Sequence, residues 1–288
     1  MNQIVRSPAG SRRDLILAGL CLKELVGAEI GPLDKPLVAK SDGDVFYVDH
    51  CDTDALKVRW SADPSVDVSN LLVDAVWGKQ TLREALVDVR ALAHRPGGID
   101  YVVASHVIEH VPDLVSWLRE IAATLSTTGA IRLAIPDRRF TFDYLRQTST
   151  LTDVLDAFVR KRRVPSGSRV LDFALHLADV DCVAAWRGEV SRQSVKPKYT
   201  VETAPGLADD AERNGTYHDV HCWVFTPVSF AGLMTELAEA KYLEFACEWF
   251  VPTATNTFEF FVSMRPEPDR GRAIDSWRQV VQQLLESA

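Results

Sequence analysis

The feature that most restricts the fold is a continuous apolar segment at residues 101–104, followed by a helical pattern and a second apolar segment. Residues 101–104 are apolar without alternation, which is typical of a central parallel strand covered on both faces. Amphipathic spacing over residues 115–125 and an apolar run at 130–135 complete a β-α-β unit. Because parallel neighbours need a crossover, this unit predicts a parallel sheet packed against helices.

The same alternation extends toward the N-terminus. Ser11 and Asp14 indicate the start of a helix, and apolar residues at helical spacing from Leu15 to Leu25 predict a short helix before the first strand. A second helical pattern covers residues 81–92. The segments predicted as strands in this region are residues 26–30, 45–48 and 71–73.

The C-terminal part predicts a different strand arrangement. Thr226 and Pro227 open a helix, and strands at 242–251 and 258–264 are close enough for a hairpin. We therefore predict an α/β fold, a Rossmann-like, doubly wound, mostly parallel seven-stranded sheet with an antiparallel C-terminal hairpin and a helical insertion. The predicted parts are a cofactor-binding core at 1–140, an insertion at 141–217 acting as lid and specificity element, the rest of the core at 218–265, and a C-terminal helix at 266–288.

Composition excludes several classes of function. The net charge of −8 and pI of about 5.4 disfavour nucleic acid as a partner, because such proteins neutralise phosphates; the basic run 160–163 leaves RNA as a minor alternative. Five scattered cysteines without a C-x-x-C pair argue against a disulfide framework. No stretch reaches the roughly 18 apolar residues of a membrane span. We expect a cytoplasmic protein with no membrane partner.

Polar residues follow the predicted parallel strands, where open α/β sheets bind ligands. Gly31 permits close backbone approach, and Glu29 is placed either to order its loop or to meet an ammonium group. Asp49, 18 residues after Gly31, suits the two hydroxyls of a ribose. Asp74 suits an adenine amino group. The residues expected to bind a cofactor are Glu29, Gly31, Pro32, Asp49, His50, Asp74, Ala75 and Ser105.

These motifs resemble those of the class I S-adenosylmethionine (SAM)-dependent methyltransferases, especially the branch with a type 11 methyltransferase domain. The resemblance rests on Glu29-Ile-Gly-Pro32, Asp49 and the segment Asp100-Tyr-Val-Val-Ala-Ser-His-Val-Ile-Glu-His-Val-Pro-Asp113. It covers residues 25–136 and, more loosely, 223–264. The resemblance implies that SAM is the cofactor. It also implies that Glu29 and Gly31 line the methionine end, Asp49 the ribose and Asp74 the adenine, with Ser105 and His106 near the methyl group.

One departure lies in the first loop. The family has further glycines after Gly31, whereas this chain has Leu33, Asp34 and Lys35. The methionine end is therefore expected to be rearranged. The missing glycines also disfavour a dinucleotide enzyme, whose pyrophosphate needs close backbone contact.

The histidines are the candidate catalytic residues. A hydroxyl acceptor needs a base with a pKa near neutrality, which makes His106, His218 and His221 candidates. His106, Glu109 and His110 also spell H-x-x-E-H, a pattern that binds metal on some helices. Because this segment fits a loop-to-helix motif directly after a strand, we predict no metal. The 218–221 cluster leaves catalytic, metal-binding and structural roles open.

The predicted function is SAM-dependent methyl transfer, with O-methylation of a small molecule or glycan preferred. Two alternatives remain. The altered loop after Gly31 is compatible with a non-catalytic cofactor-binding or regulatory protein, and the histidine clusters are compatible with a metal-dependent hydrolase.

Overall fold

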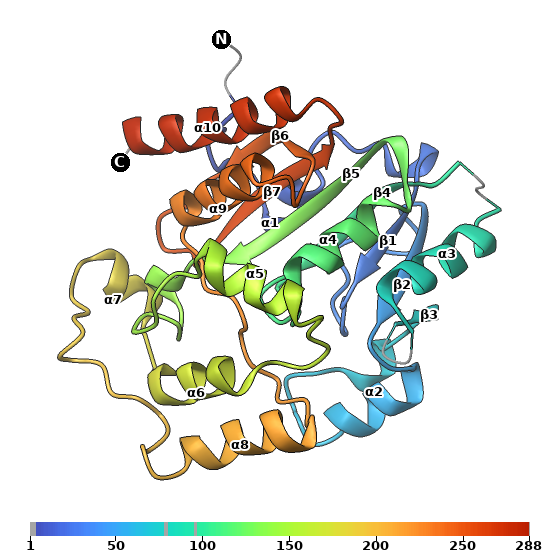
Figure 1. The fold of residues 1–288 in the computed structure, drawn as a ribbon. Helices are drawn as coiled ribbons and strands as arrows, with labels where there is room; N and C mark the ends of the chain where they lie inside the picture. Colours follow the sequence, from blue (N-terminus) through green and yellow to red (C-terminus); the bar gives the residue numbers. More distant parts are fainter. Residues whose placement is uncertain (1–3, 78–79, 95–96, 288) are drawn as a thin grey trace.

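The computed structural model describes residues 4–77, 80–94 and 97–287, and its centre is a seven-stranded sheet in the order β3-β2-β1-β4-β5-β7-β6 (Figure 1). Strands β1 to β5 run parallel, whereas β7 pairs antiparallel with both β5 and β6. This confirms the predicted sheet and hairpin. The strands are β1 (Val26–Ile30), β2 (Asp44–Asp49), β3 (Ala75–Val76), β4 (Ile99–Ser105), β5 (Leu125–Pro136), β6 (Phe245–Val251) and β7 (Glu259–Pro266).

Most predicted helices form close to their expected positions, because capping residues mark their first turns. Thr81 and Thr226 each cap a helix by accepting a backbone hydrogen bond, and Pro227 occupies the first helical position as expected. The α-helices are α1 (Arg12–Ile16), α2 (Thr53–Trp60), α3 (Leu82–Leu92), α4 (Leu114–Ala122), α5 (Leu151–Val159), α6 (Gly167–His176), α7 (Cys182–Trp186), α8 (Ala204–Asn214), α9 (Pro227–Glu239) and α10 (Arg270–Glu286).

Two hydrophobic cores cover the two faces of the sheet. The larger core includes residues of α3, α4, α9 and α10, and fully buries side chains such as Phe230 and Trp277. The smaller core joins α1 and the loop after β1 to the other face, around Tyr47, Tyr101 and Trp249. Burial on both faces explains why the central strands carry nearly continuous apolar sequences.

The segment between β5 and α9 is helical, as predicted, and contains four α-helices and the 3-10 helix η3 (Arg138–Phe140). Figure 1 shows α6, α7 and α8 together at the end of the molecule toward which the arrowhead of β5 points. Helices α6 and α8 pack against each other, and Glu212 of α8 accepts hydrogen bonds from Arg162 and from the backbone N–H of Gly167. The segment therefore stands beside the edge of the sheet at which ligands were expected.

Two predicted elements were wrong in position. The third strand was predicted at 71–73, but β3 begins at Ala75, because pairing with β2 starts only where the N–H of Asp74 donates to the carbonyl of Tyr47. The first helix ends at Ile16 instead of continuing toward Leu25. Gly19, with a φ of 80°, lies in the turn that follows, and a short 3-10 helix, η1 (Leu22–Glu24), precedes β1.

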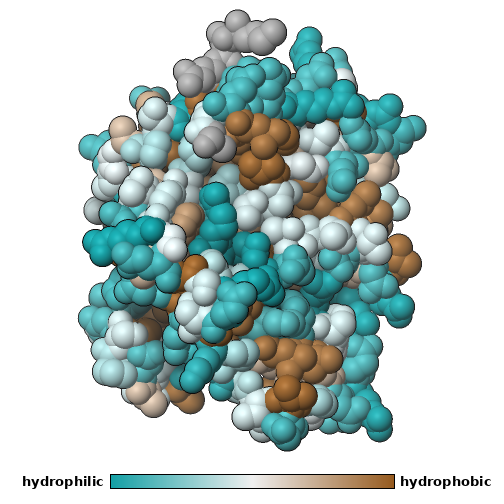
Figure 2. Space-filling model, turned by 90° about the vertical axis from the view of Figure 1, so that its left-hand side faces the viewer, coloured by the Kyte–Doolittle hydropathy of each residue, from teal (hydrophilic) through white to brown (hydrophobic). Residues whose placement is uncertain are grey.

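On the face drawn in Figure 2, exposed apolar residues do not gather into one surface. Figure 2 shows one face of the molecule, on which hydrophobic residues lie in separate patches among hydrophilic ones. Within the described part of the chain, every helix is too short or too polar to cross a bilayer.

Candidate functional site

The carboxyl ends of three neighbouring parallel strands meet at one edge of the sheet. Ile30 of β1 is in register with Val48 of β2 and with Ala104 of β4, so the residues that follow these strands lie side by side. The antiparallel β7 begins at the same edge, where Glu259 pairs with Pro136. We call this edge, formed by residues 31, 49, 105, 106 and 259, the crest.

Glu29 stabilises the loop that leads away from the crest. Its side chain is buried, and its two carboxylate oxygens accept the backbone N–H groups of Leu37 and Val38 at 2.8 and 2.9 Å. Burial raises the pKa of Glu29 to about 7, although both hydrogen bonds act in the opposite direction. Of the two roles predicted for Glu29, the geometry favours ordering the loop.

Gly31 forms a tight turn directly after β1. Its φ is +64°, and its N–H donates to the carbonyl of Val48 at 2.9 Å. A Cβ at this position would lie 3.0 Å from Cγ2 of Val107, in the loop after β4. Pro32 is buried. Leu33 also has a positive φ, 49°, so the backbone keeps a glycine-like conformation where the family has another glycine.

Asp49 lies at the end of β2 and is largely buried. Its Oδ1 accepts the backbone N–H of His50 at 2.7 Å and lies 2.6 Å from His50 Nδ1. Within the described segments, no other residue donates to this carboxylate. His50 is exposed, and its Nε2 lies 3.1 Å from Nη1 of Arg59. The carboxylate thus keeps acceptor capacity at the crest.

Asp74 was predicted to follow the third strand, but it directly precedes β3. Its Oδ2 accepts the N–H of Tyr47 at 2.7 Å and the Lys40 ammonium at 2.5 Å, so the carboxylate is used in holding β2. Ala75 is buried as the first residue of β3. The residue that reaches the crest is Trp77, whose N–H donates to the carbonyl of Asp49 at 2.9 Å.

Ser105 and His106 lie at the end of β4, beside two charged residues from remote parts of the chain. Arg12 donates to Ser105 Oγ and forms an ion pair with Glu259 at 2.7 Å. His106, at φ +54°, places Nε2 2.8 Å from Glu259 Oε2 and Nδ1 3.5 Å from Glu109 Oε1. Burial would raise the pKa of Glu259, but the contacts with His106 and Arg12 prevail and lower it.

Sequence reasoning missed Arg12 and Glu259. They are separated by 247 positions, and neither belongs to a recognisable motif. The antiparallel placement of β7 brings Glu259 to the crest, and the capped N-terminus of α1 brings Arg12 there. A pairing of this kind depends on the tertiary fold and leaves no local sequence signal.

A buried cluster adjoins His106. Glu109 is fully buried in the turn after β4, and its Oε1 lies 4.0 Å from Nε2 of His221. The ring of His221 packs at 4.6 Å from that of His110, and its Nδ1 lies 2.6 Å from Oδ2 of Asp143. Burial lowers the pKa of His110, but Asp219 and the neighbouring carboxylates outweigh this effect, and the net pKa is raised. Residues from the two predicted histidine motifs are therefore in contact.

His218 stands apart from this arrangement. Its Nε2 lies 2.9 Å from Oδ2 of Asp210 in α8. His106 and His221 both approach Glu109, whereas the observed partner of His218 belongs to the insertion. The three candidate bases therefore do not form one group.

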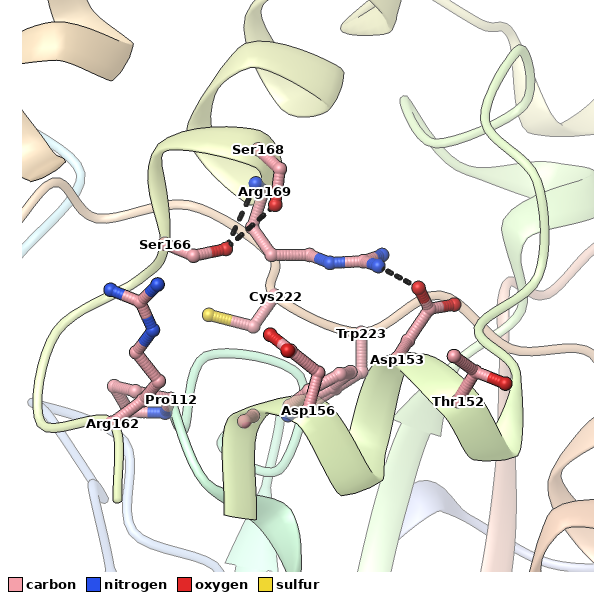
Figure 3. A pocket seen from close by; sticks show the side chains of 11 residues that line it. Pro112, Thr152, Asp153, Asp156, Arg162, Ser166, Ser168, Arg169, Cys222 and Trp223 are labelled. Atoms are coloured by element: carbon pink, nitrogen blue, oxygen red, sulfur yellow. Dashed lines mark hydrogen bonds and ion pairs between the residues drawn. The ribbon is translucent and has the colours of Figure 1, made fainter. Parts of the chain in front are cut away.

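A pocket of about 230 Å³ lies between α5, the start of α6 and residues 222–223. Figure 3 shows polar side chains from these elements around it, with an ion pair between Asp153 and Arg169. The Cys222 thiol also lines the pocket, and burial raises the pKa of Cys222 to about 12. The thiol of Cys222 is neutral, and Asp153 is paired with Arg169, so neither residue is an obvious nucleophile in this pocket.

The donor and acceptor groups of the crest fit the expected cofactor. Asp49 offers a carboxylate for a ribose diol, and Gly31 keeps side-chain atoms away from the turn after β1. Arg12 and Ser105 offer a cation and a hydroxyl, which suit the carboxylate of an amino acid. Asp49, Gly31 and Ser105 lie at the ends of the adjacent strands β2, β1 and β4, whereas Arg12 comes from α1.

Comparisons with known proteins identify the family of the chain. The family described as "Methyltransferase domain" matches residues 48–237, which is more than half of the chain. A search of curated proteins finds no match.

Solved structures show only distant similarity. A protein described as a Zn-dependent alcohol dehydrogenase from Rhodobacter sphaeroides is 10% identical with a TM-score of 0.45, over 90% of this chain and 91% of that one. The CcbJ methyltransferase from Streptomyces caelestis is 14% identical with a TM-score of 0.32, over 49% and 59%. Magnesium protoporphyrin IX methyltransferase from Synechocystis PCC 6803, with bound S-adenosylhomocysteine (SAH), is 9% identical with a TM-score of 0.34, over 84% and 74%. The family match carries more weight than these similarities.

Proposed function

Because the chain belongs to the methyltransferase-domain family and is a class I SAM-dependent methyltransferase, we propose that it methylates a hydroxyl group of a small molecule or glycan. The observation that carries this proposal is the position of His106. It directly follows β4 at the crest, with a carboxylate beside each ring nitrogen. Because Nε2 is hydrogen-bonded to Glu259 at 2.8 Å and Glu109 is 3.5 Å from Nδ1, Nδ1 would take the proton that the acceptor loses during transfer.

We propose that SAM binds along the crest. The Asp49 carboxylate would accept the ribose hydroxyls, and Arg12 with Ser105 would bind the methionine carboxylate. Trp77 replaces Asp74 as the candidate neighbour of the adenine, because it continues β3 past Asp49. Glu29, Gly31 and Pro32 would shape the methionine end through the loop instead of through a direct ammonium contact. When bound, SAM supplies a methyl group on a sulfonium, which is an excellent leaving group.

The chain's own task would then be to place the acceptor and remove its proton. His106 is the preferred base, because Glu259 orients its ring and stabilises the imidazolium that would form. Exposed aromatic surface lies next to it: the ring of Phe258 is 5.9 Å from that of His106 and is nearly half exposed. An apolar or sugar ring packed against Phe258 would present its hydroxyl toward His106.

The helical segment 141–217 would act as the lid and specificity element. Phe142, at its start, is partly exposed and packs against His221 and against Phe173 of α6. These contacts connect the insertion to the residues around Glu109. The domain limits predicted from the sequence remain part of this proposal.

The test is labelled-methyl transfer to a panel of hydroxyl, amine and carboxylate acceptors. A His106→Asn variant is expected to retain SAH binding and lose about 10²–10⁴-fold in kcat, as for loss of a general base. His218→Asn serves as the matched control, because its observed partner lies in α8. Equal losses in the two variants, or full activity of His106→Asn, would exclude His106 as the base. Transfer only to amines would contradict O-methylation.

A further inference from the structure

Three potential metal ligands converge next to the crest. Glu109 and His110 lie in the turn after β4, whereas His221 lies more than 100 residues later, after the insertion. One ligand atom from each residue can be chosen so that all three atoms lie within 4.8 Å of one another. No single sequence motif contains this set, since it combines residues of two motifs.

Glu109 provides an independent indication that something is bound here. It is fully buried, and neither of its carboxylate oxygens has a hydrogen bond among the described residues. Buried carboxylates are normally paired, hydrogen-bonded or bound to a metal. The nearest cationic candidates are ring nitrogens of His106 at 3.5 Å and His221 at 4.0 Å. Both distances exceed that of a good hydrogen bond.

His221 is oriented as a metal ligand would be. Its Nδ1 lies 2.6 Å from Oδ2 of Asp143, and Asp143 Oδ1 accepts a hydrogen bond from Arg146 at 2.8 Å. When the carboxylate accepts the Nδ1 proton, Nε2 keeps its lone pair and faces Glu109. Carboxylate–histidine pairs of this kind commonly fix the tautomer of metal-bound histidines.

The surroundings are also negatively charged. Asp219 Oδ1 lies 2.9 Å from Nδ1 of His110, so a second carboxylate contacts the cluster from the side of the insertion. Glu109, Asp143 and Asp219 together provide three carboxylates, of which Asp143 and Asp219 also pair with arginines. A divalent cation would balance the one carboxylate that remains without an arginine.

We propose that Glu109, His110 and His221 bind a divalent transition-metal ion, with Zn²⁺ as the probe. Two imidazoles and one carboxylate are a donor set that suits Zn²⁺ and leaves a coordination position open. Tetrahedral ligands at ~2.0 Å from the ion stand about 3.3 Å apart, so atoms now up to 4.8 Å apart must approach by about 1.5 Å.

The bound ion would join the turn after β4 to the segment that closes the insertion. This site goes beyond methyl transfer, because its existence does not depend on the acceptor or on the role of His106. Asp143 acts in it as a positioning residue for His221.

The experiment measures Zn²⁺ binding to the full chain by competition with a chromophoric chelator. The wild type is expected to bind one ion per chain, and Glu109→Gln and His221→Gln to bind at least 100-fold more weakly. Asp143→Asn is expected to weaken binding about 10–100-fold, as is usual for a residue that orients a ligand. His94→Gln, at an exposed histidine outside the cluster, is the matched control and should bind like the wild type.

A second measurement does not depend on the folding of any variant. X-ray absorption of the Zn²⁺-loaded wild type should reveal two imidazole ligands and oxygen donors at ~2.0 Å. Absence of stoichiometric binding, a spectrum without imidazole, or equal weakening by His94→Gln and His221→Gln would each overturn the proposal. SAH binding, measured on the same samples, tests the crest separately from the metal site.

Discussion

Replacing Gly31 by alanine tests the turn that opens the crest. At a φ of +64°, a residue with a Cβ is strained by about 1–2 kcal/mol. The new Cβ would also lie 3.0 Å from Val107 Cγ2, tighter than an ordinary van der Waals contact. We expect the melting temperature to fall by about 2–8 °C, since 1 kcal/mol corresponds to roughly 2–4 °C in a chain somewhat smaller than this one.

Gly31→Ala should weaken cofactor binding by more than its loss of stability alone would explain. The side chain of Val107, next to His106, must give way by a few tenths of an ångström to the added methyl group, and the strain at residue 31 changes the backbone conformation after β1. We expect the dissociation constant for SAH to rise at least about tenfold, equivalent to about 1.4 kcal/mol. Isothermal titration calorimetry measures this change, and thermal unfolding measures the stability.

Gly215 offers a matched control. Its φ is +67°, nearly that of Gly31, but a Cβ there meets nothing within 4 Å, and it ends α8 away from the crest. Gly215→Ala should therefore cost similar backbone strain while leaving SAH affinity unchanged. If Gly31→Ala bound SAH like the wild type, or if both variants weakened binding equally, the role assigned to the Gly31 turn would be refuted.

Three further changes test other parts of the account. The pKa of Glu29 is about 7 in the folded chain against an ordinary 4.5, so its contribution to stability is full below pH 4.5 and is lost as the pH rises through 7. In urea unfolding at different pH, the free energies of the wild type and of Glu29→Gln should therefore diverge by up to about 3 kcal/mol. Parallel curves would contradict this. Gly27→Ala would place a Cβ 2.3 Å from the buried Tyr101 ring, so it should lower the free energy of unfolding in urea by at least about 1–3 kcal/mol. An unchanged midpoint of urea unfolding would show that the ring can move freely. Asp49→Ala should lose most of the SAH affinity in calorimetry while keeping the wild-type melting temperature within about 2 °C, and unchanged affinity would remove Asp49 from the cofactor site.

Elements with a strong local signal were predictable from the sequence. The strand at 26–30 has the predicted limits, and the helix predicted at 81–92 forms at Leu82–Leu92, because burial on both faces or a capping threonine marks these elements clearly. The apolar run at 71–73 was misleading, since Leu71 is buried without belonging to a strand. Its misplacement also moved Asp74 to the wrong end of β3.

The positions of candidate site residues were predictable only where the residue lies at the end of a strand that the sequence marks clearly. Asp49 ends β2 and His106 directly follows β4, and both lie where the pattern placed them. Arg12, Glu259 and the Glu109–His221 contact depend on segments that meet only in the folded chain. The spacing of residues in the sequence does not predict such tertiary contacts.

The most direct test of the central claim is a crystal structure of the chain with SAH. The account predicts the ribose hydroxyls within hydrogen-bonding distance of the Asp49 carboxylate, and the amino-acid end between Gly31 and Ser105. A nucleoside bound in the pocket between α5 and α6, with the crest closed by the protein's own side chains, would contradict it.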